Sequence, residues 1–174
     1  MQPNHDAAPS PWVVRFLDRI QPGGAVLDLA AGSGRHTSLL LERGFAVTAS
    51  DRDVNALQAG FAQNRSCRIV AGDLEAGAFW PLGGGFDGIV VTNYLHRPLF
   101  PDLARALAPC GVLIYETFMQ GHERFGKPSN PDFLLRPDEL LEAFAGLTII
   151  GFEQGESREK RPAMIQRLAA QKPG

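Results

Sequence analysis

The sequence has little of several features that would restrict its class. Only two cysteines occur among 174 residues, Cys67 and Cys110, too few for a disulfide framework and without the spacing of a zinc site. No apolar run approaches the ~20 residues of a membrane-spanning helix, and the first residues lack a basic segment followed by an apolar one. We therefore expect a cytoplasmic protein with reduced thiols, no metal and no membrane partner.

Strong charge of either sign is absent as well. The chain has 17 Lys and Arg against 19 Asp and Glu, a formal net charge of -2, and its one short basic stretch is SREKR near the C-terminus. Proteins that bind nucleic acid have a basic surface, and this composition does not provide one. A small-molecule partner is therefore favoured, and no nucleic acid is expected. With 44% hydrophobic residues, the chain suits one globular domain over residues 1–174, as a monomer or a homodimer.

Short β-rich runs alternate with stretches of helical spacing, which is typical of a parallel sheet with crossover helices. The predicted strands are residues 25–30, 46–51, 67–73, 86–93 and 111–118. The predicted helices are a leading one at 10–20, capped by Ser10, and others at 35–43, 53–63 and 101–107. Two last runs, 147–154 and 163–170, are joined by a polar stretch too short for a helix, which predicts an antiparallel hairpin over 147–170. The fold class is α/β.

The turn after the first predicted strand, in VLDLAAGSGRHT, carries Gly32 and Gly34, which allow a ligand close to the backbone. Thr37 stands where a dinucleotide fingerprint has its third glycine, which disfavours a pyrophosphate. A carboxylate at Asp28 would repel a pyrophosphate but attract an ammonium group. Arg35 is disfavoured by the helix dipole at a helix start, so it indicates an anion nearby unless it is simply solvated. An amino acid zwitterion would satisfy both charges.

Two further acids stand at the ends of predicted strands. Asp51 ends the second strand, close to the ~20-residue offset from the glycines at which an acid reaches ribose hydroxyls. Asp53 is interpreted as the N-cap of the following helix. Asp73 closes the third strand, either as a ligand contact or as a turn residue. A nucleoside joined to a zwitterion describes S-adenosylmethionine.

Five ordered segments, VLDLAAGSGRH, VTASD, AGDLE, FDGIVVTNYL and LARALAPCGVLIYET, resemble the motifs of class I S-adenosylmethionine-dependent methyltransferases. They cover about residues 25–118, and their order and spacing together are specific. The continuations NYLHRPLFP and GHERFGKPSNPDFLLRPDELL are similar to the small bacterial TehB-like tellurite-resistance group. The resemblance implies a Rossmann-like, doubly wound sheet of seven strands, mostly parallel, with an antiparallel final strand. It also implies S-adenosylmethionine as the cofactor.

By position, this resemblance places the two glycines with Asp28 along the methionine end, Asp51 at the ribose, and Asp73 with Leu74 at the adenine. Ala30 departs from the glycine that the family usually has there. The full set of predicted cofactor contacts is Asp28, Ala30, Gly32, Gly34, Arg35, Asp51, Arg52, Asp73, Leu74 and Asn93.

The exit of the fourth predicted strand, TNYLHRP, faces the methyl group in this fold. It offers Tyr94 and His96 as candidate catalytic residues, and His96 can act as a base near neutral pH without a large shift. A structural hydrogen-bonding role for this histidine is the alternative. The segment lacks the two prolines of enzymes that methylate the amino groups of adenine or glutamine, which disfavours nucleic-acid and protein-amide acceptors.

Residues 119–136 are predicted to form a long structureless loop, and such a loop in a compact domain is typically a lid or substrate loop. His122, Arg124, Lys127 and Arg136 make it net positive, which favours an anionic acceptor such as a carboxylate or an oxyanion. A packed surface loop with solvated charges is the alternative.

The sequence thus predicts a methyltransferase acting on a small molecule. A nicotinamide-dependent oxidoreductase, which Asp28 and the absent third glycine disfavour, and a non-catalytic S-adenosylmethionine-binding regulator remain the alternatives.

Overall fold

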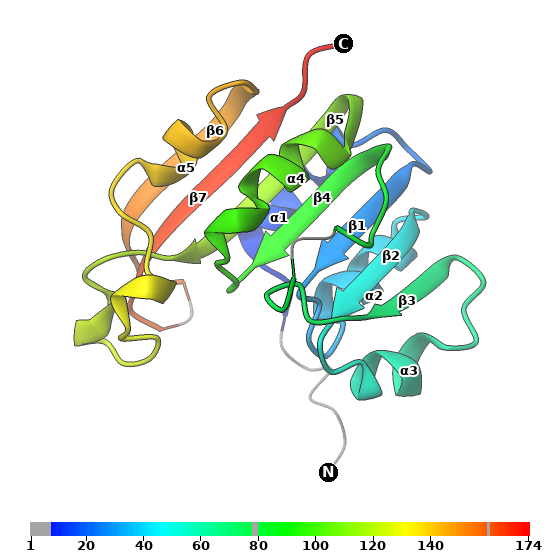
Figure 1. Ribbon diagram of the computed structural model, residues 1–174, viewed down its shortest axis with the longest axis horizontal. Helices are drawn as coiled ribbons and strands as arrows, with labels where there is room; N and C mark the ends of the chain where they lie inside the picture. Colours follow the sequence, from blue (N-terminus) through cyan, green and yellow to red (C-terminus); the bar gives the residue numbers. More distant parts are fainter. Residues whose placement is uncertain (1–7, 78–79, 160) are drawn as a thin grey trace.

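One seven-stranded sheet, in the order β3-β2-β1-β4-β5-β7-β6, runs through the molecule (Figure 1). The structure is a computed structural model that describes residues 8–77, 80–159 and 161–174. The strands are β1 Ala25–Leu29, β2 Ala46–Asp51, β3 Cys67–Ala71, β4 Phe86–Thr92, β5 Leu107–Phe118, β6 Thr148–Ser157 and β7 Ala163–Gln171. The α-helices are α1 Pro11–Phe16, α2 Arg35–Glu42, α3 Asn55–Phe61, α4 Phe100–Ala106 and α5 Glu139–Ala143. Short 3₁₀ turns are η1 Leu17–Arg19, η2 Arg97–Leu99, η3 His122–Arg124 and η4 Pro131–Phe133.

The strand directions confirm the predicted fold class. The first five strands pair in parallel, and β7 runs antiparallel between β5 and β6. The chain leaves the centre of the sheet in one direction through β1, β2 and β3, then returns to add β4 on the other side of β1. Ligands of open α/β sheets bind at the carboxyl ends of the strands where the order reverses, so the exits of β1 and β4 define where a site is expected.

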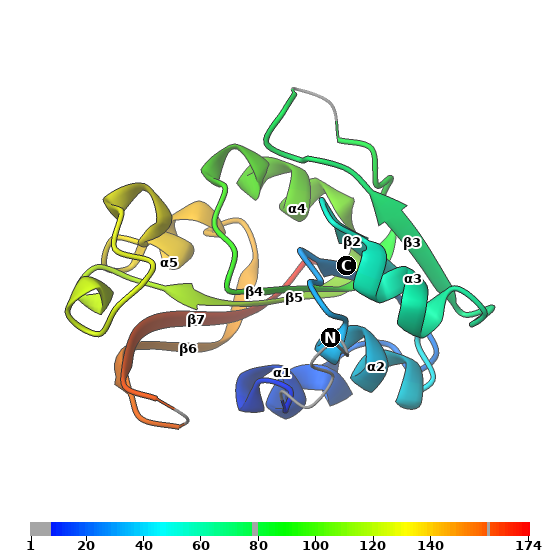
Figure 2. The same ribbon diagram turned by 90° about the horizontal axis from the view of Figure 1, so that it is seen from below.

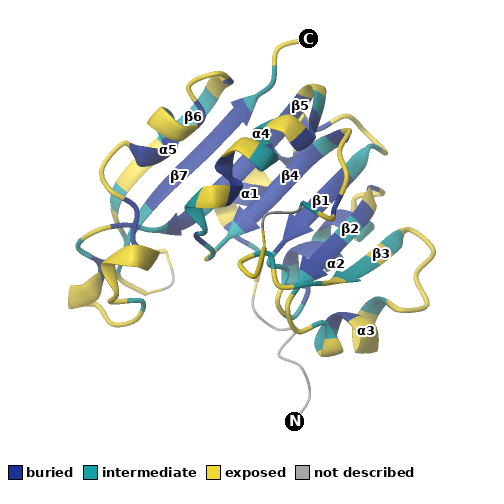
Figure 3. Cartoon of the chain, viewed as in Figure 1, coloured by how far each residue is buried: buried dark blue, intermediate teal, exposed yellow. Residues whose placement is uncertain are grey.

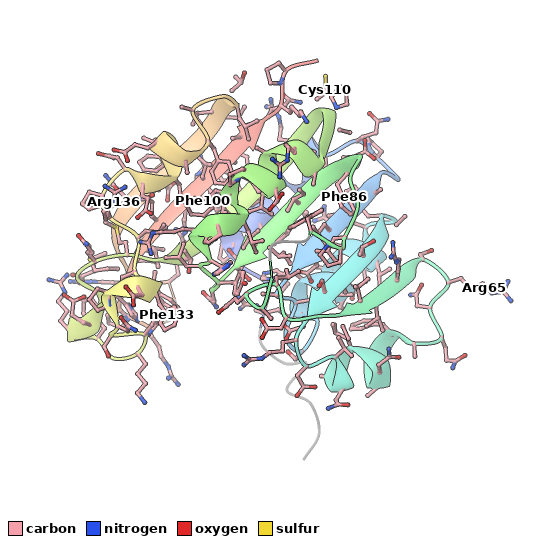
Figure 4. The ribbon with its side chains drawn as sticks, in the orientation of Figure 1. Arg65, Phe86, Phe100, Cys110, Phe133 and Arg136 are labelled. Atoms are coloured by element: carbon pink, nitrogen blue, oxygen red, sulfur yellow. The ribbon has the colours of Figure 1, made fainter. Side chains whose placement is uncertain are left out.

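Helices cover both faces of the sheet (Figure 2), with α1 and α2 on one face and α4 and α5 on the other. Neighbouring residues of a strand therefore point into two different cores: Val26 packs with Trp12 and Leu40, and Leu27 with Phe100 and Leu140. Because both faces are covered, the central strands are largely buried, as Figure 3 shows for β1, β4, β5 and β7, and most of their buried residues are apolar. Phe100 lies over the sheet (Figure 4), edge-on to Tyr115 at 6.1 Å between ring centroids.

Several predicted ends of strands, and one predicted helix N-cap, are wrong at the turns. Ala30 and Asn93, predicted as the last residues of two strands, have left-handed φ values of 53° and 54°, so β1 and β4 each end one residue earlier. The third strand stops at Ala71, which leaves Asp73 in the loop beyond it. Asp53 is not the N-cap of α3, a position held by Val54; its carboxylate instead accepts a hydrogen bond from the Asn55 backbone at 3.0 Å.

Segment 119–136 is not structureless, which corrects the prediction. It contains η3 and η4, and its two ends pair with each other: Gln120 N donates to Leu135 O at 2.9 Å, and Leu135 N donates to Phe118 O at 3.0 Å. Figure 4 shows Phe133 and Arg136 in the lobe that this segment forms beside the sheet.

One partly buried ion pair joins that lobe to the exit of β4. Arg97 contacts the Glu139 carboxylate twice, at 2.5 and 3.0 Å, and donates to the backbone oxygens of Asp132 and Leu134 at 2.7 and 2.9 Å. The guanidinium therefore holds η4 and α5 against the loop that follows β4. Within the described part of the chain, no helix combines the length and apolarity needed to cross a membrane.

Candidate functional site

Two pockets open near the carboxyl ends of the parallel strands. The smaller pocket, of about 260 Å³, lies at the exits of β1 to β4 and is lined by Ala30, Ser50, Asp51, Arg52, Gly72, Asp73, Leu74, Glu75 and Tyr94. The larger pocket, of about 540 Å³, lies at the exits of β4 and β5. Its lining is Ser10, Pro11, Arg35, Asn93, Glu116, Phe118, His122, Phe125, Lys127, Ser157, Glu159, Arg161, Pro162, Ala163, Ile165 and Arg167.

Asp51 fixes the glycine turn against the end of β2. One of its carboxylate oxygens accepts from Gly32 N at 2.8 Å, and the other accepts from Asp53 N at 3.1 Å. Ala31 N adds a bond to Ser50 O at 3.0 Å. Because a carboxylate oxygen has more than one lone pair, Asp51 can hold the turn and still accept hydrogen bonds from a ligand.

The two glycines of the turn serve different purposes, although both are left-handed, with φ of 56° at Gly32 and 86° at Gly34. A Cβ at Gly32 would meet nothing within 4 Å, whereas at Gly34 it would lie 2.4 Å from Phe61 and 3.0 Å from Leu57. Gly32 therefore leaves space for a ligand, and Gly34 allows α3 to pack against the turn. The sequence alone assigned both to the ligand.

Asp28 lies behind the turn. Its side chain is 2% exposed, lines neither pocket, and accepts a hydrogen bond from Thr37 Oγ1 at 2.6 Å. Thr37, notable in the sequence only as a missing glycine, thus ties the start of α2 to β1. Burial raises the pKa of Asp28 to about 7, although the hydrogen bonds from Thr37 oppose this.

We expect the substitution Asp28→Asn to stabilise the protein in mildly alkaline solution. A carboxyl whose pKa is about 7 in the folded state, against an ordinary value of 3.8, keeps its proton in the folded state over a range of pH in which the unfolded chain loses it. The free energy of unfolding therefore falls as the pH rises through that window. Asparagine can still accept from Thr37 and does not ionise, so it should gain ~1–3 kcal/mol over the wild type above about pH 7.5. Urea unfolding at several pH values measures this, and a parallel pH dependence of the two proteins would contradict it.

Asp73 is a turn residue that also lines a pocket. Its carboxylate accepts from Glu75 N at 2.9 Å, as a turn residue does, and the residue also lines the smaller pocket beside Leu74. Ser50 adds a feature that the sequence did not suggest. Its hydroxyl is the one buried side-chain polar atom, among the residues that the structure describes, without a hydrogen-bond partner, and Ser50 lines the same pocket. An unpartnered buried hydroxyl at a pocket indicates a ligand contact.

The two candidate catalytic residues are not brought together. Tyr94 lines the smaller pocket, and burial, followed by the nearby Glu75 carboxylate, raises the pKa of its phenol above the ordinary value. The phenol thus stays protonated near neutral pH and can donate a hydrogen bond rather than take up a proton. His96 lines neither pocket, and its backbone oxygen accepts from Leu99 N at 3.0 Å at the start of η2. The structure therefore does not support the prediction of a base at this position.

Arg35 and Asn93, predicted as cofactor contacts, line the larger pocket. Arg35 Nη1 donates to Ala8 O at 3.4 Å, and Asn93 N donates to Glu116 O at 2.9 Å. Neither residue lines the smaller pocket, although each follows a strand that ends near it.

A buried ionic cluster forms one wall of the larger pocket, and the sequence analysis missed it. Arg167 is 7% exposed and contacts Glu116 at 2.5 Å, Glu159 at 2.5 Å and Glu153 at 3.4 Å. The only signal in the sequence was an arginine inside a predicted strand that is mostly apolar.

The positive charge predicted for segment 119–136 is largely compensated. Arg124 pairs with Glu156 at 3.0 Å, and Arg136 with Glu142 at 3.3 Å. The Nδ1 atom of His122 accepts from Met164 N at 3.3 Å, so its Nε2 donates to Lys127 O at 3.1 Å, which describes a neutral imidazole.

The sequence analysis also gave no role to the histidine at position 36, His36. It is buried at the start of α2, where its Nε2 accepts from Ser10 N at 3.0 Å and its Nδ1 lies 3.3 Å from Thr92 Oγ1. It thereby ties the N-cap of α1 to the end of β4. No group of three metal-ligating side chains occurs in the described ranges.

Comparisons with known proteins agree with this geometry. Residues 26–111 match the family model described as a methyltransferase domain. The chain is 32% identical over 119 residues to protein-L-isoaspartate O-methyltransferase of Gloeobacter violaceus, covering 59% of this chain and 56% of that protein. It is 30% identical over 164 residues to trans-aconitate 2-methyltransferase of Rhizobium meliloti, covering 86% and 57%. The chain thus spans a little over half the length of these curated relatives.

Solved structures show the same fold. TehB from Haemophilus influenzae superposes with a TM-score of 0.78 at 18% identity, covering 94% of this chain and 62% of that one. The 1,6-didemethyltoxoflavin-N1-methyltransferase of Burkholderia thailandensis, solved with its substrate and S-adenosylhomocysteine bound, has a TM-score of 0.72 at 22% identity, covering 94% and 77%.

Proposed function

Because the chain belongs to the class I S-adenosylmethionine-dependent methyltransferases, we propose that it transfers the methyl group of S-adenosylmethionine to a small-molecule acceptor. The observation that carries this proposal is the turn at Gly32, where open space adjoins the Asp51 carboxylate. Within the class we assign the chain to the TehB-like group, which the likeness in fold supports, as a single methyltransferase domain over residues 1–174.

The residues of the smaller pocket fit this cofactor. Asp51 offers carboxylate oxygens to the two ribose hydroxyls, and the Ser50 hydroxyl lacks a partner within the described chain. Asp73 and Leu74 provide an acceptor and an apolar contact for the adenine. Ala30 and Arg52 complete the pocket, and its tight left-handed turns leave the backbone of Gly32 accessible.

At the other end of the cofactor, Arg35 would meet the methionine carboxylate, and Asn93 would lie beside the reacting group. Asp28 acts from behind the turn, where an ammonium group nearby favours its ionised form. When bound, S-adenosylmethionine supplies an electrophilic methyl group on a sulfonium. The protein holds the acceptor in line with that methyl and excludes water, an effect worth up to ~7–11 kcal/mol.

The nicotinamide alternative uses the same Asp51 but a different turn. The dinucleotide fingerprint has a glycine where this chain has Thr37, and the Thr37 hydroxyl is bonded to Asp28 behind the turn. A non-catalytic S-adenosylmethionine-binding regulator shares every cofactor contact, so only a transfer assay separates it from an enzyme.

That assay uses S-adenosylmethionine labelled in its methyl group with thiols, amines, carboxylates, tellurite and selenite as acceptors. We expect label on one acceptor class with equimolar S-adenosylhomocysteine formed, and a loss of at least about tenfold in rate at subsaturating cofactor for Asp51→Asn. Asp102→Asn, a change on the far helix α4, is the matched control. Binding of S-adenosylhomocysteine without transfer to any acceptor would favour the regulator.

We further propose a cytoplasmic location, a monomeric or homodimeric state, and no nucleic-acid partner. Two unpaired cysteines, Cys67 and Cys110, and a formal net charge of -2 support these assignments. Cell fractionation and light scattering test the first two.

A further inference from the structure

The larger pocket is more positive than the protein around it. Among the described residues, its lining contains four cations, Arg35, Lys127, Arg161 and Arg167, against two carboxylates, Glu116 and Glu159, whereas the whole chain has a net charge of -2. Both carboxylates contact Arg167 at 2.5 Å. With Arg35 assigned to the cofactor, Lys127 and Arg161 face the pocket without a carboxylate partner in the described chain.

Apolar side chains form the rest of the wall. Phe118 of β5 and Ile165 of β7 lie on the pocket side of the sheet, and Phe125, 37% exposed, lines it from segment 119–136. The volume of about 540 Å³ is in the range of pockets that enclose organic ligands. An inorganic oxyanion would leave these apolar surfaces uncovered, so the occupant has an organic body as well as a negative charge.

The lining also lacks a side chain ready to accept a proton, as far as the described residues go. His122 uses both ring nitrogens in backbone hydrogen bonds. Glu116 and Glu159 each accept a hydrogen bond from the Arg167 guanidinium, so both carboxylates are already engaged. The acceptor must therefore arrive with a nucleophilic lone pair that carries no proton. At neutral pH that disfavours aliphatic amines, alcohols and most phenols, and the excess of cations in the lining favours an anion such as a carboxylate, whose ordinary pKa is about 4.

We propose that the acceptor is an organic acid with an apolar, ring-sized body, methylated on its carboxylate oxygen. The proposal rests on the proposed function. A lone pair of the carboxylate oxygen forms the new C–O bond to the methyl carbon, and the C–S bond breaks with its electron pair remaining on sulfur. One negative and one positive charge disappear, no proton moves, and the products are a neutral ester and S-adenosylhomocysteine. Lys127 and Arg161 attract the acid but not the ester, which favours product release.

The binding test uses protein saturated with S-adenosylhomocysteine and three acids as probes, benzoate, 3-phenylpropanoate and indole-3-acetate, each paired with its neutral amide. Calorimetry should show at least one acid binding about tenfold or more tightly than its amide. The double variant Lys127→Gln/Arg161→Gln should lose that preference and keep its affinity for S-adenosylhomocysteine. Arg158→Gln, which removes an exposed cation paired with Glu156, is the matched control and should bind the acids as the wild type does.

Two results would overturn the proposal while leaving the proposed function intact. One is binding of S-adenosylhomocysteine with no preference for any acid over its amide. The other is label transfer to an amine, a thiol, tellurite or selenite rather than into a base-labile methyl ester. With saturating cofactor, a carboxylate acceptor itself contributes no pH dependence to the transfer rate between about pH 6 and 9, since it has already lost its proton. Failure of S-adenosylhomocysteine itself to bind would instead contradict the proposed function.

Discussion

Replacement of Arg97 by glutamine should lower the free energy of unfolding by ~2–4 kcal/mol. The substitution leaves the carboxylate of Glu139, a residue only 4% exposed, without its bidentate partner, and it removes the donors to two backbone oxygens of η4. We expect this loss in the free energy of unfolding to be smaller than the largest losses found for buried ion pairs. The reason is that the Arg97 side chain is 35% exposed and that Arg136 N still donates to Glu139 at 2.7 Å. Urea denaturation measures the change.

The dependence of the free energy of unfolding on pH shows whether the ion pair between Arg97 and Glu139 is the cause of the loss. Burial raises the pKa of Glu139, but the hydrogen bonds from Arg97 and Arg136 outweigh burial and leave this pKa below its ordinary value of 4.5. The stabilisation is therefore present above about pH 4.5 and is lost as the pH falls through the folded-state pKa. Arg105→Gln, which removes an exposed partner of Asp102, should cost less than ~0.5 kcal/mol. Equal losses for the two arginines would contradict the role of the buried pair.

This ion pair shows what the sequence could not predict. The apolar runs predicted the parallel strands, since strands covered on both faces have no polar alternation, and the polar connection after residue 154 predicted the hairpin. Nothing in the sequence linked Arg97 to Glu139, because the contact depends on how segment 119–136 folds back on the loop after β4. That segment was predicted as structureless because its short 3₁₀ turns have no periodic signal.

The substitutions Gly32→Ala and Gly34→Ala should have different main effects. The first should mainly weaken cofactor binding, and the second should mainly lower the free energy of unfolding. At Gly34 the added Cβ would lie 2.4 Å from Phe61, so we expect a loss of ~2–4 kcal/mol in the free energy of unfolding from overpacking and left-handed strain. At Gly32 it meets nothing within 4 Å, so the cost should be only the ~1–2 kcal/mol of left-handed backbone. The affinity for S-adenosylhomocysteine should nevertheless fall by about tenfold or more for Gly32→Ala, because the Cβ enters the proposed cofactor space.

The double variant Gly34→Ala/Phe61→Ala is the control for the overpacking. Removing the ring should make the alanine at Gly34 less costly than it is in the wild type, as a double-mutant cycle would measure. An unchanged affinity for S-adenosylhomocysteine in Gly32→Ala would place the cofactor away from this turn.

The candidate site was predicted unevenly for a physical reason. Residues at the ends of parallel strands must share one edge of the sheet, so Asp51, Asp73 and Leu74 could be brought together from the sequence alone. The direction in which each side chain points could not be predicted from the sequence. Asp28 proved to lie behind the turn, and His96 outside both pockets. Ser50 and Arg167 were missed because each lies inside a strand, where polar residues give no motif.

The central claim is that the Gly32 turn and Asp51 hold S-adenosylmethionine. Calorimetric titration of the wild-type protein with S-adenosylhomocysteine, and separately with NAD under the same conditions, tests it most directly. The account predicts saturable one-to-one binding of S-adenosylhomocysteine, weakened in the Asp51→Asn variant, and no measurable binding of NAD. Binding of NAD without binding of S-adenosylhomocysteine would contradict it.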